Sequence, residues 1–126
     1  MAITIVLALT SLWHFLAFWH FTLHPARTLA RISKERPISA IATEAVRFLG
    51  GINAGFVVLG LAALALPAGT RWPALVALCV ANLSQLVVDL RVRRLGLAHG
   101  PYFMQILIGD AVFTVANAGA AIFSVA

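Results

Sequence analysis

Charged residues are scarce in this chain, and their scarcity excludes a soluble globular domain. Only 10% of the 126 residues are charged and 62% are hydrophobic, with a mean hydropathy of +0.99. Soluble domains are about one quarter charged and about one half apolar. A chain this short cannot hide such an excess of apolar surface in its own core. The apolar surface is therefore expected to face lipid.

Cysteine is nearly absent as well, since Cys79 is the single one and lies inside an apolar run. A lone cysteine cannot form a disulfide within the chain, and the CxxC pattern of redox and zinc sites is missing. The phosphate-binding motifs GxxxxGK[ST] and GxGxxG, the nucleophile elbow and the zinc motif HExxH are missing too. The sequence thus carries no motif of a cysteine-based redox enzyme or of these nucleotide-binding and hydrolytic classes.

Four long apolar segments are present, and each is long enough to cross a membrane as a helix of about 20 residues. They cover approximately residues 2–23, 41–66, 72–90 and 101–125. In lipid a segment must satisfy its backbone polar groups internally, so these segments should be helices. The sequence predicts a single integral membrane domain, residues 1–126, with four transmembrane helices in an all-α antiparallel bundle. The first segment is longer than a signal-peptide core and has no basic residue before Arg27, so it should stay in the mature protein.

The basic residues are unevenly distributed among the loops, and this predicts an orientation. Eight of nine lie in loops 24–40 and 91–101 or just beyond the first of them, whereas Arg71 lies in the tight turn at 67–71. The positive-inside rule places both basic loops in the cytoplasm and both termini outside, in a bacterial inner membrane. Loop 24–40 is long enough for a short amphipathic helix on the membrane surface. The tight turn predicts that the second and third helices are antiparallel neighbours.

The net charge of +5 would suggest nucleic-acid binding in a soluble protein. Because the charges concentrate in membrane loops, anionic lipid headgroups at 24–40 and 91–101 are the expected partners, and nucleic acid is not. Gly51 and Gly55 form a small-residue face on the second helix, and the fourth helix is rich in alanine. Such faces predict close helix packing. Part of this surface is expected to contact a second copy of the chain or another membrane protein.

Polar side chains occur at matching depths in the cytoplasmic half of all four spans, counted at about 1.5 Å per residue. At about 100° per residue, Asn82, Gln85 and Asp89 fall within about 60° on the third helix, whereas His14 and Gln105 do not align with their neighbours. Polar groups in a membrane usually face the bundle interior. The pattern predicts a polar cavity that opens to the cytoplasm. Its candidate lining residues are Trp13, His20, Glu44, Arg47, Asn82, Gln85, Asp89 and Asp110.

Asp110 is the most informative of these residues, because a carboxylate near mid-membrane either pairs with Arg47 or a histidine or carries a proton. Three interpretations are open for the set: a polar network that holds the helices in register, a ligand pocket, or a path for protons or ions. Glu44 has a simpler alternative as a partner of Arg47 three residues on. Asp89 has one too, as a partner of the arginines that follow it.

Acid–base chemistry on a lipophilic molecule would use His20, Glu44 and Asp110 as candidate catalytic residues. His20 with either carboxyl group, in a partly dry site beside Trp13 or Trp19, could move a proton. The aromatic faces could stabilise a developing positive charge.

The histidines are candidate ligands for a metal ion or a haem. His20 and His24 lie one turn apart on one helix face, and Glu44 or Asp89 could complete a set of two histidines and one carboxylate. A b-type haem usually needs axial histidines from two helices. Here three of the four histidines belong to the first helix and His99 to a loop, so a haem site would require a homodimer.

The stretch HPARTLARISKERPISAIATEAVRFLGGINAGFVVLGLAAL, residues 24–64, resembles the second-helix region of small bacterial membrane proteins of the BphX-like kind. The residues that carry the resemblance are Arg47, Phe48, Leu49, Gly50, Gly51, Asn53 and Gly55. It covers about a third of the chain. It implies a similar length and number of spans and a setting in the degradation of hydrophobic compounds, but no established reaction or catalytic residues.

Three functions follow from these observations. The first is binding of a lipophilic small molecule or lipid in a cytoplasm-facing cavity, with or without acid–base chemistry. The second is a structural or accessory subunit of a larger membrane complex. The third is a small oligomeric transporter, for which Asp110 would be the acidic residue within the membrane.

Overall fold

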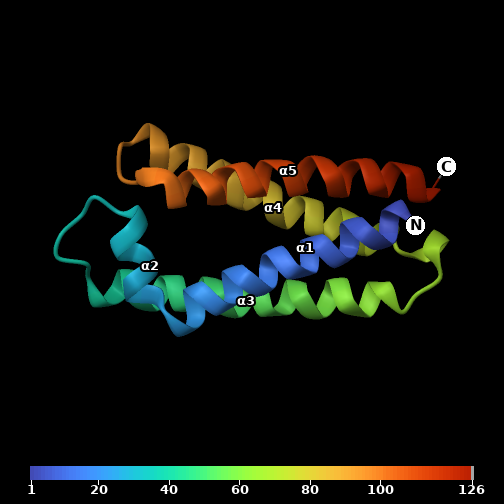
Figure 1. Ribbon diagram of the computed structural model, residues 1–126, viewed down its shortest axis with the longest axis horizontal. Helices are drawn as coiled ribbons and strands as arrows, with labels where there is room; N and C mark the ends of the chain where they lie inside the picture. Colours follow the sequence, from blue (N-terminus) through green and yellow to red (C-terminus); the bar gives the residue numbers. More distant parts are fainter. Residues whose placement is uncertain (126) are drawn as a thin grey trace.

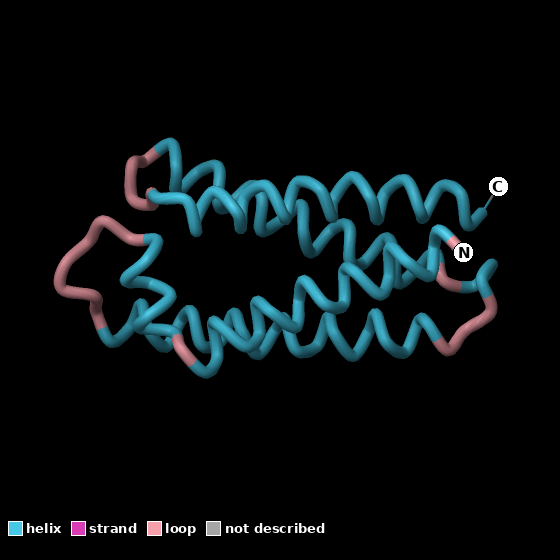
Figure 2. The backbone as a smooth tube through the Cα atoms, viewed as in Figure 1, coloured by secondary structure: helices cyan, strands magenta, loops and turns pink. Residues whose placement is uncertain are grey.

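The computed structural model describes residues 1–125 and is an all-helical membrane protein, as predicted. Four helical segments are long and apolar enough to cross a membrane: Ala2–Leu23, Ala40–Leu64, Trp72–Arg94 and Gly100–Ser124. The elements are α1 (Ala2–Phe18), η1 (Trp19–Leu23), α2 (Pro25–Ile32), α3 (Ala40–Leu64), η2 (Ala68–Thr70), α4 (Trp72–Arg94) and α5 (Gly100–Val125). Figure 2 shows helices joined by short loops, with no strand over these residues.

The helix ends follow local chemistry. α3 begins after Ser39, whose Oγ accepts a hydrogen bond from the backbone N–H of Ala42 at 3.1 Å, as an N-cap does. α4 extends beyond the predicted residue 90 to Arg94, because basic side chains in a last turn favour the helix dipole. Gly96 then ends the helix, because its φ of +71° is left-handed. The N–H of Leu97 donates to the carbonyl of Val92, which completes a Schellman motif.

The short helix expected in loop 24–40 is present as α2. The last turn of the first span, η1, is a π-helix turn, and His24 leaves the helical conformation with φ −131° and ψ 43°. Pro25 then opens α2, where its missing N–H costs nothing. The chain therefore bends sharply at His24, so that α2 and η1 enclose Thr28, which is buried.

The four spans are arranged as two helix pairs. α1 packs along α3, and α4 packs along α5 (Figure 1). The turn at 65–71 does make α3 and α4 antiparallel, but the two helices contact each other far less than either contacts its main partner. The prediction that they are antiparallel is confirmed, but they are not each other's main packing partners, because a short connection fixes only where two helices meet and not how far they stay in contact.

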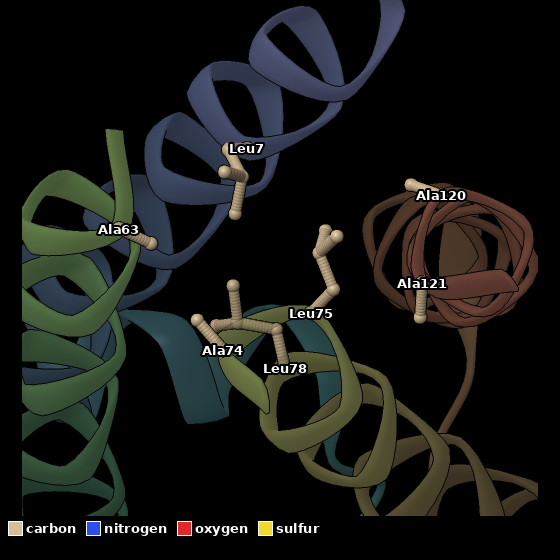
Figure 3. Close-up of a cluster of buried hydrophobic side chains, with 7 residues drawn as sticks. All are labelled: Leu7, Ala63, Ala74, Leu75, Leu78, Ala120 and Ala121. Carbon is tan, nitrogen blue, oxygen red and sulfur yellow. The ribbon is translucent and has the colours of Figure 1, made fainter. Parts of the chain in front are cut away.

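The two pairs meet in an apolar core near the chain termini. Figure 3 shows this core, to which all four spans contribute. Its buried residues are Leu7, Ala63, Ala74, Leu75, Leu78, Ala120 and Ala121. The four alanines let the helix backbones approach closely, as is typical of helix contacts in membranes.

The opposite end of the bundle carries the two basic loops, and there the structure adds contacts that the sequence did not predict. Ser33 and Ala98 form an isolated β-bridge, and the N–H of His99 donates to the carbonyl of Ile32 at 2.8 Å. These bonds tie the end of α2 to the α4–α5 loop (Figure 1). Arg71 lies at the other end, with the termini, and donates to backbone carbonyls at the end of α3. We call the two ends the basic end and the terminal end.

The packing glycines of α3 are not the ones predicted. A Cβ added to Gly51 or Gly55 would meet nothing within 4 Å in the described chain, so this face points outward. A Cβ on Gly50 would instead lie 2.7 Å from the backbone nitrogen of Thr22, and one on Gly60 would overlap a serine of α1. α3 therefore packs on the first span through Gly50, which meets η1, and Gly60, which meets α1, and not through the predicted pair.

We predict that Gly50→Ala lowers the free energy of unfolding by about 1–3 kcal/mol, the usual cost of overpacking, because the backbone at Thr22 must move. Gly51→Ala is the matched control and should change stability by no more than about 1 kcal/mol. Reversible unfolding of the purified protein in bicelles measures both. Equal effects of the two substitutions would contradict this packing.

Candidate functional site

A layer of buried polar side chains crosses the bundle next to the apolar core. His14 is completely buried, and its Nδ1 lies 2.7 Å from Oδ1 of Asn53, while its Nε2 lies 3.5 Å from Nδ2 of Asn82. An amide oxygen only accepts and an amide nitrogen only donates. The neutral histidine that is protonated on Nδ1 therefore satisfies both contacts at once. One side chain of α1 is thus bonded to α3 and to α4.

A second pair of side chains extends this layer to α5. Nδ2 of Asn117 donates to Oγ1 of Thr10 at 3.1 Å, and the hydroxyl returns a bond of 3.4 Å to the amide oxygen. Both residues are completely buried. We call Thr10, His14, Asn53, Asn82 and Asn117 the polar layer. It joins α1 to the other three spans.

The angular comparison set His14 aside, and the structure corrects this. His14 belongs to the buried stripe of α1 that includes Leu7, Thr10 and Ser11. This spacing of three and four residues was visible in the sequence. Histidine spacing is therefore the wrong guide to its orientation, since His14 shares its face with buried residues of α1 and not with His20.

Two adjoining cavities lie between the polar layer and the basic end. The first, of about 210 Å³, lies between α1–η1, α4 and α5, and the second, of about 290 Å³, lies between α3, α4 and α5. Both are lined by Phe21, Gln85, Ile106 and Asp110. We call the two together the central cavity. Its position agrees with the predicted polar cavity, but most of its wall is apolar.

Asp110 is held at the centre of this cavity by Trp13. The indole Nε1 donates to Oδ1 of Asp110 at 2.9 Å, and the ring stacks on Phe113 with centroids 5.6 Å apart. Gly109 makes this possible, since a Cβ there would overlap the indole ring. The bond connects α1 to α5 at the boundary between the polar layer and the cavity.

Asp89 faces Asp110 across the second cavity. Both carboxyl groups line the cavity wall. Oδ2 of Asp89 is buried and has no hydrogen-bond partner among the described residues. Across residues 1–125, the single ion pair joins Glu44 and Arg47, so neither aspartate is neutralised by a basic side chain. The alternative pairing of Asp89 with the following arginines is therefore wrong.

Glu44 and Arg47 do not line the cavity, although they were predicted to. Arg47 donates to both carboxylate oxygens of Glu44 at 2.7 and 2.9 Å, and the two side chains are 49% and 63% exposed, respectively. This is the simpler alternative considered for the pair, and it is confirmed. Asn82 is also absent from the cavity wall, because it belongs to the polar layer. The error arose because depth was known from the sequence whereas the rotation of α3 was not.

The cavity also contains residues that the sequence did not single out. Tyr102 lies against His20, with ring centroids 6.0 Å apart, and both line the first cavity. Gln105, set aside with His14, lines it as well. Tyr102 is the only tyrosine of the chain and stands at the start of the fourth span. This position could have identified Tyr102 from the sequence, since tyrosines at a membrane interface often have a polar partner.

The expected pairing of His20 and His24 with a carboxylate as metal ligands is not formed within residues 1–125. No group of three or more His, Cys, Asp or Glu side chains within residues 1–125 is placed to hold a metal ion. His20 and His24 share a pocket with Arg27 and Arg31, an electropositive setting that disfavours a cation. His99 lies in the α4–α5 loop, far along the chain from the fully bonded His14.

Comparison of the chain with protein-family models, curated proteins and solved structures found no match in any of the three. The resemblance of residues 24–64 to BphX-like proteins therefore stays a prediction.

We predict that Asn53→Leu lowers the free energy of unfolding by about 1–2 kcal/mol, because the buried N–H of His14 loses its acceptor. The control is Ser84→Ala, an exposed residue whose hydroxyl bonds only within its own helix; its effect should stay within about 0.5 kcal/mol. Unfolding in bicelles measures both. If Asn53→Leu is as mild as the control, the polar layer does not stabilise the bundle.

We predict that Gly109→Ala breaks the bond between Trp13 and Asp110 and costs about 1–3 kcal/mol of stability, because the added methyl group occupies the space of the indole ring. Gly119→Ala, on the same helix and with open space around it, is the matched control. The indole N–H resonance of Trp13 in a nitrogen-15 NMR spectrum reports the bond directly. It should shift in the first variant alone, and an unchanged resonance would contradict the arrangement.

Proposed function

We propose that this integral membrane protein binds a lipophilic small molecule or lipid in the central cavity. The observation that carries the proposal is that two largely apolar cavities meet at Asp110, with Asp89 in the wall of the second, and that neither carboxyl group has a basic partner in the described chain. Ligand pockets are typically apolar with a few convergent polar groups, and start at about 300 Å³. The two adjoining cavities agree with that pattern.

The wall of the cavity indicates what kind of molecule would fit. Phe21, Ile106 and the ring of Trp13 supply apolar contact, whereas Gln85 and the aspartates supply hydrogen bonds at one place. A ligand with an apolar body and one polar group would match this division. Acid–base chemistry in the cavity would fall to His20, Asp89 and Asp110, since Glu44 lies outside it.

The orientation belongs to the same proposal. Loops 24–40 and 91–101 lie together at the basic end, near the cavity, and the termini lie at the other end (Figure 1). The positive-inside rule would place the basic end in the cytoplasm, with the N- and C-termini outside, if the membrane is a bacterial inner membrane. The ligand would then enter from the cytoplasmic side or from the inner leaflet.

Binding is favoured over transport because an apolar core closes the bundle between the cavity and the terminal end. The terminal half of the bundle contains the polar layer and then the apolar core, in which Leu7, Leu75 and Leu78 are completely buried (Figure 3). A transport path would need polar groups through that half. The accessory-subunit function has one specific feature in its favour, the outward face of Gly51 and Gly55, which is flat enough for another helix to approach.

The proposal predicts that Ile106→Trp blocks the cavity, because a larger side chain fills space that both cavities share. The probe is a diazirine-bearing fatty alcohol, photolysed with the protein in nanodiscs, and the labelled peptides are identified by mass spectrometry. Specific labelling of the cavity residues should fall about tenfold, a loss of about 1.4 kcal/mol in binding.

The matched control is Ile108→Trp on the same helix, since Ile108 is exposed on the outer surface. It should leave the cavity labelling unchanged. Asp110→Asn should weaken the labelling while the protein stays folded. Equal labelling of the wild type and both tryptophan variants would overturn the proposal and leave the subunit function as the better explanation of the fold.

A further inference from the structure

A separate small pocket of about 220 Å³ lies where the first span turns into α2. It is lined by Trp19, His20, His24, Arg27, Thr28 and Arg31. Four of these six side chains carry or can carry positive charge. None of the six except His20 lines the central cavity, so the two sites adjoin but have different walls and opposite electrostatic character.

The bend of the chain builds this pocket. After η1, His24 leaves the helix and Pro25 starts α2 in a new direction. Thr28 fixes the bend, since its backbone N–H donates to the carbonyl of His24 at 2.9 Å and its hydroxyl donates to the carbonyl of His20 at 3.0 Å. The pocket is therefore part of a hydrogen-bonded turn and not a chance gap between mobile side chains.

The two arginines of the pocket repel each other, and a bound anion would neutralise this repulsion. Arg27 and Arg31 are four residues apart on α2, where like charges repel and destabilise a helix. Neither makes an ion pair with an acidic residue in the part of the chain that the structure describes. Arg31 is held in place, since its guanidinium carbon lies 5.6 Å from the ring centre of Tyr102. Arg27 and Arg31 thus line one pocket, and neither has an acidic partner within residues 1–125.

The surroundings of the pocket match the depth of lipid headgroups. Trp19 and Leu23 are 46% and 50% exposed on the outer surface of η1. Tryptophan is enriched at the level where headgroups meet acyl chains. A phosphate in the pocket could therefore belong to a lipid whose chains lie along Trp19 and Leu23, and guanidinium groups are well suited to bind its oxygens in pairs.

We propose that this pocket is a specific binding site for a phosphate group, with Arg27 and Arg31 as its principal ligands. An anionic phospholipid and a soluble phosphate ester present the same chemistry to it. The site is independent of the proposed ligand of the central cavity, because neither arginine contacts that cavity. Either proposal can fail while the other holds.

The experiment counts bound lipids by native mass spectrometry on the full chain in detergent with added phosphatidylglycerol, phosphatidylcholine or inorganic phosphate. The wild type should retain one phosphatidylglycerol in preference to phosphatidylcholine. The double variant Arg27→Gln/Arg31→Gln should bind it about 30-fold more weakly, taking about fivefold for each guanidinium group. The matched control is Arg91→Gln/Arg94→Gln, which removes the same charge from the other basic loop and should retain the lipid.

The outcomes separate the alternatives. Retention that inorganic phosphate does not displace assigns the site to a lipid, whereas binding of inorganic phosphate without lipid retention assigns it to a soluble phosphate. Equal weakening in both double variants, or no preference for phosphatidylglycerol together with no binding of phosphate, would overturn the site, because binding would then reflect the overall charge of the basic end. Photolabelling of the central cavity should be unchanged in Arg27→Gln/Arg31→Gln, which distinguishes failure here from failure of the proposed function.

Discussion

The structure depends on the polar bonds that α1 makes with the other three spans. α1 packs along α3, but it also contributes Thr10, Trp13 and His14, whose partners lie on α3, α4 and α5. Lipid offers no hydrophobic drive for one helix to prefer another, so packing and interhelical hydrogen bonds decide the arrangement. Without these bonds, only the apolar core at the terminal end and the contacts of α2 with the α4–α5 loop at the basic end would hold the two helix pairs together. α1 is therefore the helix that turns two hairpin-like pairs into one bundle.

The central cavity lies where the first span no longer makes hydrogen bonds to both helix pairs. Beyond Trp13 and His14 the first span continues into η1 and then bends at His24, so it no longer bridges the pairs. The pairs are joined again only at the basic end, where α2 meets the α4–α5 loop through Ser33 and Ala98. Between these two connections the facing surfaces are not filled, and the cavities lie there. The π-helix turn supports this view, since such turns are often found at functional sites.

The sequence predicted the four spans, the short helix of loop 24–40 and the depth of the polar residues. These depend on hydropathy and helix rise, which are local properties. It did not predict which face of each helix points inward, because in a membrane helix the outer face is apolar as well and the usual contrast is lost. Glu44 and Arg47 were therefore assigned to the cavity although they face outward, and Gly51 was taken for Gly50. His20, Gln85, Asp89 and Asp110 do lie in the walls of the two cavities.

The buried polar groups of this bundle are of two kinds, and the difference between them is the basis of the proposed function. The ring nitrogens of His14 and the side chains of Thr10 and Asn117 have partners, as a structural network requires. Asp89 and Asp110 both line the second cavity, where Asp110 accepts a hydrogen bond from Trp13 and Oδ2 of Asp89 has no partner in residues 1–125. A carboxyl group within a membrane is costly, and apolar replacements could fill the same space at lower cost. Asp110 belongs partly to the structural network, since its bond with Trp13 joins α1 to α5, whereas the side chain of Asp89 makes no hydrogen bond to another span within residues 1–125. A stabilising role alone therefore does not account for Asp89, whereas a ligand that brings its own polar group to the cavity would.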